Sequence, residues 1–280
     1  GKVMTEETLT GEAPPKKLTK RFVLLLLLGM MLAQALLHLP FFSKEPMGQH
    51  VWRQVVGHAM ARNYHTESAD FFAPRNDIRP YAENDGKIWH EFPMVYWLIG
   101  KSYQYTGVQP ANARVIWFLF SVLCIPIAYI FARQMHWDRL RSLLFSYCFS
   151  FVPYFYYYSI TLAPNLHGLM WFLLGFALLL RAERKDFRCW EFVGGLVFLS
   201  LATVSKPTYL FFGLPVAALF LWSYAVKRNR QILIGAGIGG GFVAMTNGLI
   251  IWHASRLYAA APVEQQVHTP IGPAERPENW

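Results

Sequence analysis

Apolar and polar stretches alternate along this chain in a pattern that predicts a membrane protein built from helices. A helix needs about 20 mostly apolar residues to cross a bilayer, and seven blocks approach or exceed that length. They cover residues 22–42, 113–133, 140–162, 164–181, 190–205, 208–226 and 231–253. The fifth and sixth blocks are separated only by Ser205-Lys206-Pro207, but together they are too long for one broken helix. We therefore expect an all-α integral membrane protein with about seven transmembrane helices.

One long polar segment interrupts this pattern between the first two apolar blocks, at residues 43–112. Its first part, residues 50–63, has the spacing of an amphipathic helix lying on the membrane surface. The apolar face of that helix should hold Trp52, Val55 or Val56, Ala59 and Met60, with Arg53 and Arg62 toward the other faces. Residues 92–105, which follow an irregular stretch at residues 70–86, are apolar and aromatic but too short to cross, and they predict a second interfacial or a re-entrant helix. Because the rest of the chain has the character of a scaffold, we expect the chemistry in this loop.

The composition agrees with a membrane protein. Hydrophobic residues make up 54% of the chain and charged residues only 15%, while the 16% of aromatic residues suits bilayer interfaces. The net charge of +9 falls in short runs between apolar blocks and does not form one continuous basic face. We therefore expect membrane lipid as a partner and no nucleic acid.

Basic residues indicate the orientation of the chain in the membrane. Lys and Arg near helix ends favour the cytoplasmic side, and here a basic cluster precedes the first crossing and follows every even-numbered one. The clusters are Lys16, Lys17, Lys20 and Arg21; Arg133, Arg139 and Arg141; Arg181, Arg184, Lys185 and Arg188; and Lys227, Arg228 and Arg230. We expect a cytoplasmic tail at residues 1–20, a transmembrane module at residues 21–255 with its loop at 43–112 exported, and an extended exported tail at residues 256–280.

Lys206 is the most informative single cation. It stands at a helix boundary on the expected outer side, against the positive-inside trend, and Pro207 follows it directly. An ammonium at this depth requires water or an anion. Two interpretations stay open, a lysine that snorkels to water and a phosphate partner for a lipid-linked substrate.

Glu91 is the corresponding acid. It stands beside His90 and shortly before Pro93, at the start of the second expected interfacial helix. A carboxylate at a bilayer boundary can act as a general base or a metal ligand, and the alternative is an exposed loop acid. The histidines of the loop are a candidate set for a divalent metal, but their spacing matches no specific metal site. They are His50, His58, His65 and His90.

Several short motifs occur in an order that resembles a known family. They are Trp52-Arg53-Gln54, Ala61-Arg62-Asn63, Glu91-Phe92-Pro93 leading into Tyr96-Trp97-Leu98-Ile99-Gly100, Tyr157-Tyr158-Ser159 before Pro164, and Ser205-Lys206-Pro207-Thr208. Over about residues 20–255 the chain resembles bacterial membrane glycosyltransferases of the GT-C type. The nearest branch contains the protein mannosyltransferases and the 4-amino-4-deoxyarabinose transferase of lipid A.

The resemblance implies a seven-helix module in the bacterial inner membrane, with the active site in the first exported loop. Such enzymes transfer a sugar from a polyprenyl-phosphate donor to an acceptor at the outer face. Glu91 matches the family's acid-before-Pro position, and Asp77 is a second catalytic candidate. The resemblance implies Lys206, Arg53, Arg62 and Tyr158 as ligands of the donor phosphate, and Trp52, His50, His90 and Asn165 as residues of the substrate pocket.

Two positions depart from the family pattern. Family members typically read Trp-Arg-Gln-Ala-Asp, with the Asp as the base, whereas Val55 and Val56 follow Gln54 here. Asn165 stands where an acid is expected after Pro164. Valine cannot accept a proton, so catalysis requires another acid, and the substitutes are Glu91, Asp70, Asp77 and Asp85. The alternative is a non-catalytic GT-C-like scaffold or lipid-binding subunit, with other membrane protein subunits as its partners.

Overall fold

The computed structural model describes residues 18–46, 48, 50–77, 86–87, 89, 91–187 and 190–259, with side chains as far as residue 257. Helices dominate this part of the chain, where extended backbone pairs only in an isolated bridge between Arg75 and Lys87. The expected all-α fold is confirmed. Asp85, His90, most of the expected cytoplasmic tail and nearly all of the expected exported tail lie outside the described residues.

Every expected apolar block is helical. The α-helices are α1 (Lys20–His38), α2 (Val51–Thr66), α3 (Met94–Thr106), α4 (Pro110–Val122), α5 (Cys124–Gln134), α6 (Arg139–Phe151), α7 (Pro153–Tyr158), α8 (Asn165–Glu183), α9 (Trp190–Ser205), α10 (Gly213–Lys227) and α11 (Arg230–Ala259). Two short 3₁₀ helices, η2 (Leu39–Phe41) and η3 (Pro207–Phe212), extend α1 and precede α10. Both helices expected in the first loop are present, as α2 and α3.

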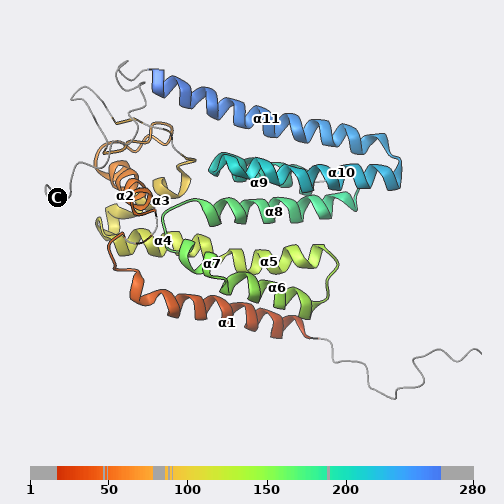
Figure 1. The fold of residues 1–280 in the computed structure, drawn as a ribbon, viewed down its shortest axis with the longest axis horizontal. Coiled ribbons are helices and arrows are strands. Elements are labelled where there is room, and N and C mark those ends of the chain that lie inside the picture. Colours follow the sequence, from red (N-terminus) through yellow and green to blue (C-terminus); the bar gives the residue numbers. More distant parts are fainter. Residues whose placement is uncertain are drawn as a thin grey trace, which may run out of the picture.

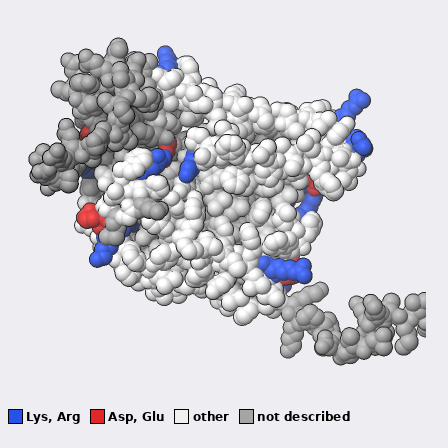
Figure 2. All heavy atoms as spheres, in the orientation of Figure 1, with Lys and Arg blue, Asp and Glu red and all other residues white. Residues whose placement is uncertain are grey.

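Within the described residues, five segments are long and apolar enough to cross a membrane. They are Lys20–Phe41, Pro110–Gln134, Asn165–Glu183, Pro207–Lys227 and Arg230–Leu257. The long helices run side by side, and α2 and α3 lie together at one end of the molecule (Figure 1). Figure 2 shows a broad surface with few charged side chains between the two ends of the visible face, which is the surface that a bilayer requires. The protein is an integral membrane protein.

Two of the seven expected crossings, the third and the fifth, form helices too short to be among these five segments. The fifth, α9 (Trp190–Ser205), has the length of its apolar block, whereas the third is shorter than its block. The third block breaks at Val152, which is extended (φ −71°, ψ 146°), because Pro153 disfavours helical backbone in the residue before it. The block therefore forms α6, with 13 residues, and the short α7. The fifth and sixth blocks are separate, as expected, and Lys206 between them is extended (φ −154°, ψ 115°).

The helix α2 buries a different face from the one that its apolar spacing predicts. Two of the expected apolar positions, Ala59 and Met60, are buried, whereas Trp52 and Val55 are 54% and 49% exposed. Arg53, expected on an outer face, instead reaches Glu91. Small residues decide the orientation, because a Cβ atom on Gly57 would lie 2.9 Å from a ring carbon of Tyr96. The helix α2 can therefore approach α3 closely only along the face that contains Gly57.

Candidate active site

Glu91 is a buried acid just before α3. It is only 6% exposed, which excludes its interpretation as an exposed loop acid. Its carboxylate forms an ion pair with the guanidinium of Arg53, in the first turn of α2. The Tyr96 hydroxyl donates a hydrogen bond to the other carboxylate oxygen, Oε2, at 2.9 Å. Charge-assisted contacts of this kind compensate the burial of the carboxylate and fix its position.

The sequence around Glu91 builds this geometry locally. Pro93 is the N-cap residue of α3, so that Tyr96 falls in the first turn of the helix. Tyr96 is only 2% exposed, and its ring lies 5.4 Å from the ring of Trp117. Tyr96 is a site residue that the sequence did not single out, although it belongs to the run after Glu91-Phe92-Pro93. Sequence spacing does not reveal which aromatic side chain of that run turns inward.

Lys206 forms the second part of the site. Its ammonium donates a hydrogen bond to Oδ1 of Asn165, the first residue of α8, and the Tyr209 hydroxyl donates to the main-chain oxygen of Asn165. Asn165 is 8% exposed. Burial lowers the pKa of the Lys206 ammonium below its ordinary value, and the charge of Arg53 lowers it further. The Lys206 ammonium is thus held by a protein group, the side-chain oxygen of Asn165.

The two parts lie near each other, because one small cavity is bordered both by Tyr96, which contacts Glu91, and by Pro164 and Ser205, the chain neighbours of Asn165 and Lys206. The charge of Arg53 also lowers the pKa of Lys206. Glu91 compensates the charge of Arg53. Among the residues that the structure describes, no carboxylate lies within ion-pair distance of the Lys206 ammonium. Lys206 is consequently an uncompensated positive charge, which is a suitable partner for a phosphate group.

A second acid–base pair lies elsewhere in the first loop. Arg62 contacts both carboxylate oxygens of Asp77 at 2.5 Å, and both side chains are 45% exposed. The Asn63 amide donates a further hydrogen bond to Asp77 at 2.9 Å. No contact recorded between described residues joins this pair to Glu91 or Lys206. The phosphate-binding role of Arg62 and the catalytic role of Asp77 stay predictions.

Valine occupies the place where the family pattern has an acid. Val56 borders a small cavity of about 20 Å³ together with Trp52, Arg53 and Glu91. Trp52 is half exposed, and the Arg53 guanidinium lies 5.4 Å from the centroid of its ring. Val55 faces outward. The Glu91 carboxylate thus reaches the same space as the side chain at position 56.

The remaining candidates lie near the edge of the site. His50 is exposed and adopts a left-handed conformation (φ 56°) immediately before α2. The Tyr158 ring lies 4.6 Å from the Tyr154 ring on α7. Their roles, and that of His90, stay predictions.

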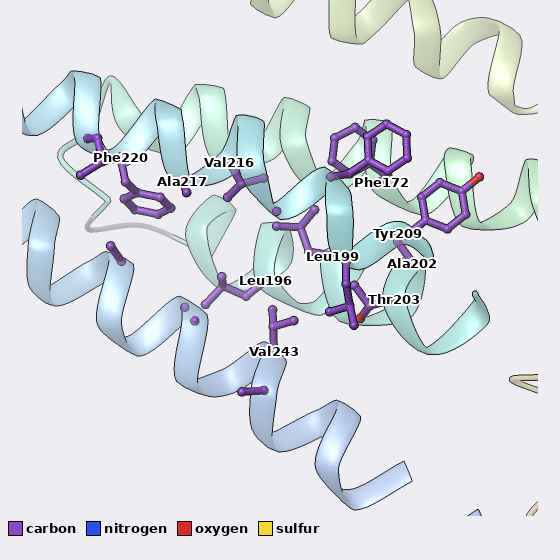
Figure 3. A pocket seen from close by; sticks show the side chains of 18 of the residues that line it. Phe172, Leu196, Leu199, Ala202, Thr203, Tyr209, Val216, Ala217, Phe220 and Val243 are labelled. Atoms are coloured by element: carbon purple, nitrogen blue, oxygen red, sulfur yellow. The ribbon is translucent and has the colours of Figure 1, made fainter. Parts of the chain in front are cut away.

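A large apolar cavity of about 450 Å³ lies between α8, α9, α10, α11 and η3. Phe172, Leu196, Leu199 and Val243 project into it, as Figure 3 shows. Tyr209 forms part of its wall, while its hydroxyl donates to Asn165. The cavity therefore begins beside the residue that holds Lys206. An apolar space of this size within membrane-spanning helices accommodates hydrocarbon.

The described residues contain no group of three or more His, Cys, Asp or Glu side chains that could hold a metal ion. His58 is half-buried, and burial, together with the charge of Arg114, lowers its pKa to about 4. It is therefore neutral at physiological pH, and its Nε2 atom has no hydrogen-bond partner. These contacts give no support to the divalent-metal alternative within the described residues.

Long apolar helices and a buried polar site beside α2 and α3 define the chain as an integral membrane protein with its polar site at one end of the helices. The family model for dolichyl-phosphate-mannose-protein mannosyltransferase matches residues 90–252. The chain belongs to this family and is a membrane glycosyltransferase of the GT-C type. No curated protein and no solved structure matches it. The matched segment contains Glu91, Tyr96, Asn165 and Lys206, whereas Arg53 precedes it.

Proposed function

We propose that the protein transfers a sugar from a polyprenyl-phosphate donor to an acceptor at the outer face of the bacterial inner membrane. The proposal rests on two groups of the same site. One is the Lys206 ammonium, whose charge no described carboxylate compensates, and the other is the buried Glu91 carboxylate, which Arg53 holds in position. The first supplies a binding partner for the donor phosphate. The second supplies a group that can accept a proton.

The reaction that this arrangement suits is a direct displacement at the anomeric carbon. The acceptor's nucleophilic atom attacks that carbon and forms the new glycosidic bond, while the bond from the carbon to the phosphate oxygen breaks. The polyprenyl phosphate leaves with the bonding electron pair, and Lys206 stabilises its negative charge. Glu91 takes the proton of the acceptor, and the configuration at the anomeric carbon is inverted.

The apolar cavity supports a lipid-linked donor. A polyprenyl chain is a hydrocarbon, and the cavity is lined by apolar side chains of four membrane helices and η3. Tyr209 connects the wall of this cavity to the Asn165–Lys206 contact. A donor with its phosphate at Lys206 would extend part of its chain into this space.

The distribution of charge supports the proposed orientation. At the end of the molecule opposite α2 and α3, Arg184 donates to the main-chain oxygen of Gln134 at 2.6 Å, and Lys227 contacts Glu183 at 2.9 Å. These contacts place basic residues from two of the expected cytoplasmic clusters, Arg184 and Lys227, at the same end of the molecule. The opposite end then faces outward, with the site under the first loop, and we propose an N-terminus on the cytoplasmic side.

The alternative is a lipid-binding subunit without catalysis. The specific observation that favours it is the small size of the cavity beside Glu91, about 20 Å³, together with valine at position 56. Such a subunit would bind polyprenyl phosphate at Lys206 without turning over a donor. Other membrane proteins would then carry out the chemistry.

Turnover separates the two functions. The purified protein is placed in liposomes with a polyprenyl-phosphate donor labelled in its sugar, and bacterial membrane extract serves as the source of acceptor. We expect release of free polyprenyl phosphate and label on the acceptor, and Lys206→Ala should reduce both at least about tenfold. Binding of the lipid without release or transfer would support the subunit instead, and unchanged turnover in Lys206→Ala would remove Lys206 from the donor site.

A further inference from the structure

Asn165 contacts two polar side chains of the segment that follows α9. Its Oδ1 atom accepts a hydrogen bond from the Lys206 ammonium, and its main-chain oxygen accepts one from the Tyr209 hydroxyl. The residue is 8% exposed, so these contacts hold it inside the protein.

The position of Asn165 is determined by the start of α8. Asn165 is the first residue of α8, and its main-chain N–H donates to the oxygen of Ala163 at 2.7 Å in the preceding turn. Three residues later, Gly168 leaves room for the ring of Tyr209, which a Cβ atom would displace. The position of the side chain is therefore fixed on both sides, by the turn and by the aromatic ring.

The chemistry of an amide explains what this residue does for Lys206. An amide oxygen accepts a hydrogen bond from an ammonium without cancelling its charge, whereas a carboxylate at the same place would form an ion pair with it. Glu91 already compensates Arg53. With an amide at position 165, the charges on Arg53, Glu91 and Lys206 leave the site with one positive charge.

We propose that Asn165 is a positioning residue that holds the Lys206 ammonium in place while preserving its charge, and that it thereby sets the affinity for the anionic lipid phosphate. This inference rests on the proposed function, because it assigns the phosphate to Lys206. It adds a specificity-determining role for the neutral amide. An acid at position 165 would compete with the phosphate for the same ammonium.

Binding of polyprenyl phosphate to the purified full chain in liposomes tests the proposal. Asn165→Asp should weaken binding about tenfold or more, because the new carboxylate pairs with Lys206. The matched control is Gln104→Glu, which adds the same charge at an exposed position on α3 and should leave binding unchanged. The apparent KM for the donor should rise in Asn165→Asp with a much smaller change in kcat.

A double-mutant cycle distinguishes positioning from a general structural effect. On a Lys206→Ala background, Asn165→Asp should cost little further affinity, because the partner of the new carboxylate is gone. An equal loss on both backgrounds would overturn the proposal, as would unchanged binding in Asn165→Asp alone. Thermal unfolding of each variant shows whether it is folded, and Asn165→Ser provides a smaller neutral side chain should the acid fail to fold. Asn165→Ser should retain more binding than Asn165→Asp, and the reverse order would contradict the proposal.

Polyprenyl phosphate binding by the two single variants distinguishes a failure of this inference from a failure of the proposed function. If Lys206→Ala leaves polyprenyl phosphate binding unchanged, the assignment of the phosphate to Lys206 is wrong and the proposed donor site falls. If Lys206→Ala abolishes binding while Asn165→Asp does not alter it, only the role of Asn165 is wrong.

Discussion

The Tyr96 hydroxyl donates a hydrogen bond to Oε2 of Glu91 at 2.9 Å, and both side chains are buried. The same hydroxyl lies 3.4 Å from the main-chain oxygen of Leu162, the last residue of the third apolar block. Tyr96 thus connects the acid of the first loop to the membrane helices. The position of the acid depends on this connection, and so does its use as a base.

Tyr96→Phe tests that connection. The change removes one hydroxyl and leaves a buried carboxylate oxygen without its donor, which costs about 1–3 kcal/mol. We expect turnover to fall about tenfold while donor binding stays near that of the unchanged protein. Tyr105→Phe is the control, since Tyr105 is 84% exposed on the same helix. Equal turnover in the two variants would show that Tyr96 has no part in positioning Glu91.

Gly168→Ala tests the packing that places Tyr209. The added Cβ atom would enter the Tyr209 ring, which must shift and lose its bond to Asn165. Overpacking of this kind costs about 1–3 kcal/mol, and we expect a lower thermal stability together with weaker binding of polyprenyl phosphate. Gly237→Ala on α11 is the control, because its Cβ atom meets nothing within 4 Å. Unaltered binding in Gly168→Ala would separate Tyr209 from the donor site.

The affinity for polyprenyl phosphate should depend on pH through Lys206. Burial and the Arg53 charge lower the pKa of the free ammonium below 10.5, and Tyr154, Tyr209 and Glu91 are the other titratable groups around the site. A bound phosphate favours the charged form and raises that pKa. Affinity is therefore complete below the pKa of the free site and falls as the pH rises through it. Lys206→Arg should flatten this dependence, since a guanidinium stays charged; an equal slope in both proteins would contradict the assignment.

Asp77→Asn separates a structural role in the loop from a catalytic one. Asp77 and Arg62 are each 45% exposed, and an ion pair of that exposure contributes about 0–1 kcal/mol. We expect a small loss of thermal stability and turnover within about twofold of the unchanged protein. A loss of turnover as large as that of a variant at Glu91 would instead place Asp77 in the chemistry.

The sequence predicted the helices well, because the length and apolarity of each block follow from the thickness of a bilayer. The separation of α9 from α10 at Lys206 was predicted correctly for this reason. The break at Pro153 was missed, because hydropathy alone continues across it. Pro153, a proline within the third apolar block, was the feature of the sequence that could have predicted the break.

The site could be predicted only in part. Glu91 and Lys206 were singled out because charges at a membrane boundary are costly without a partner. The inward direction of Arg53 was not predicted, because it depends on Gly57 letting α2 approach Tyr96, a contact between segments far apart in the chain. That Glu91 pairs with Arg53, and Asp77 with Arg62, depends on the same tertiary packing, which periodicity does not encode.

The most direct test of the account is the rate of sugar transfer by Glu91→Gln in the liposome assay. The amide keeps the size of the side chain but cannot accept the proton, so we expect turnover to fall at least about 100-fold while polyprenyl phosphate still binds. Adding Val56→Asp to this variant places a carboxylate in the same cavity and should restore part of the activity. Transfer by Glu91→Gln at the rate of the unchanged protein would contradict the assignment of Glu91 as the catalytic base.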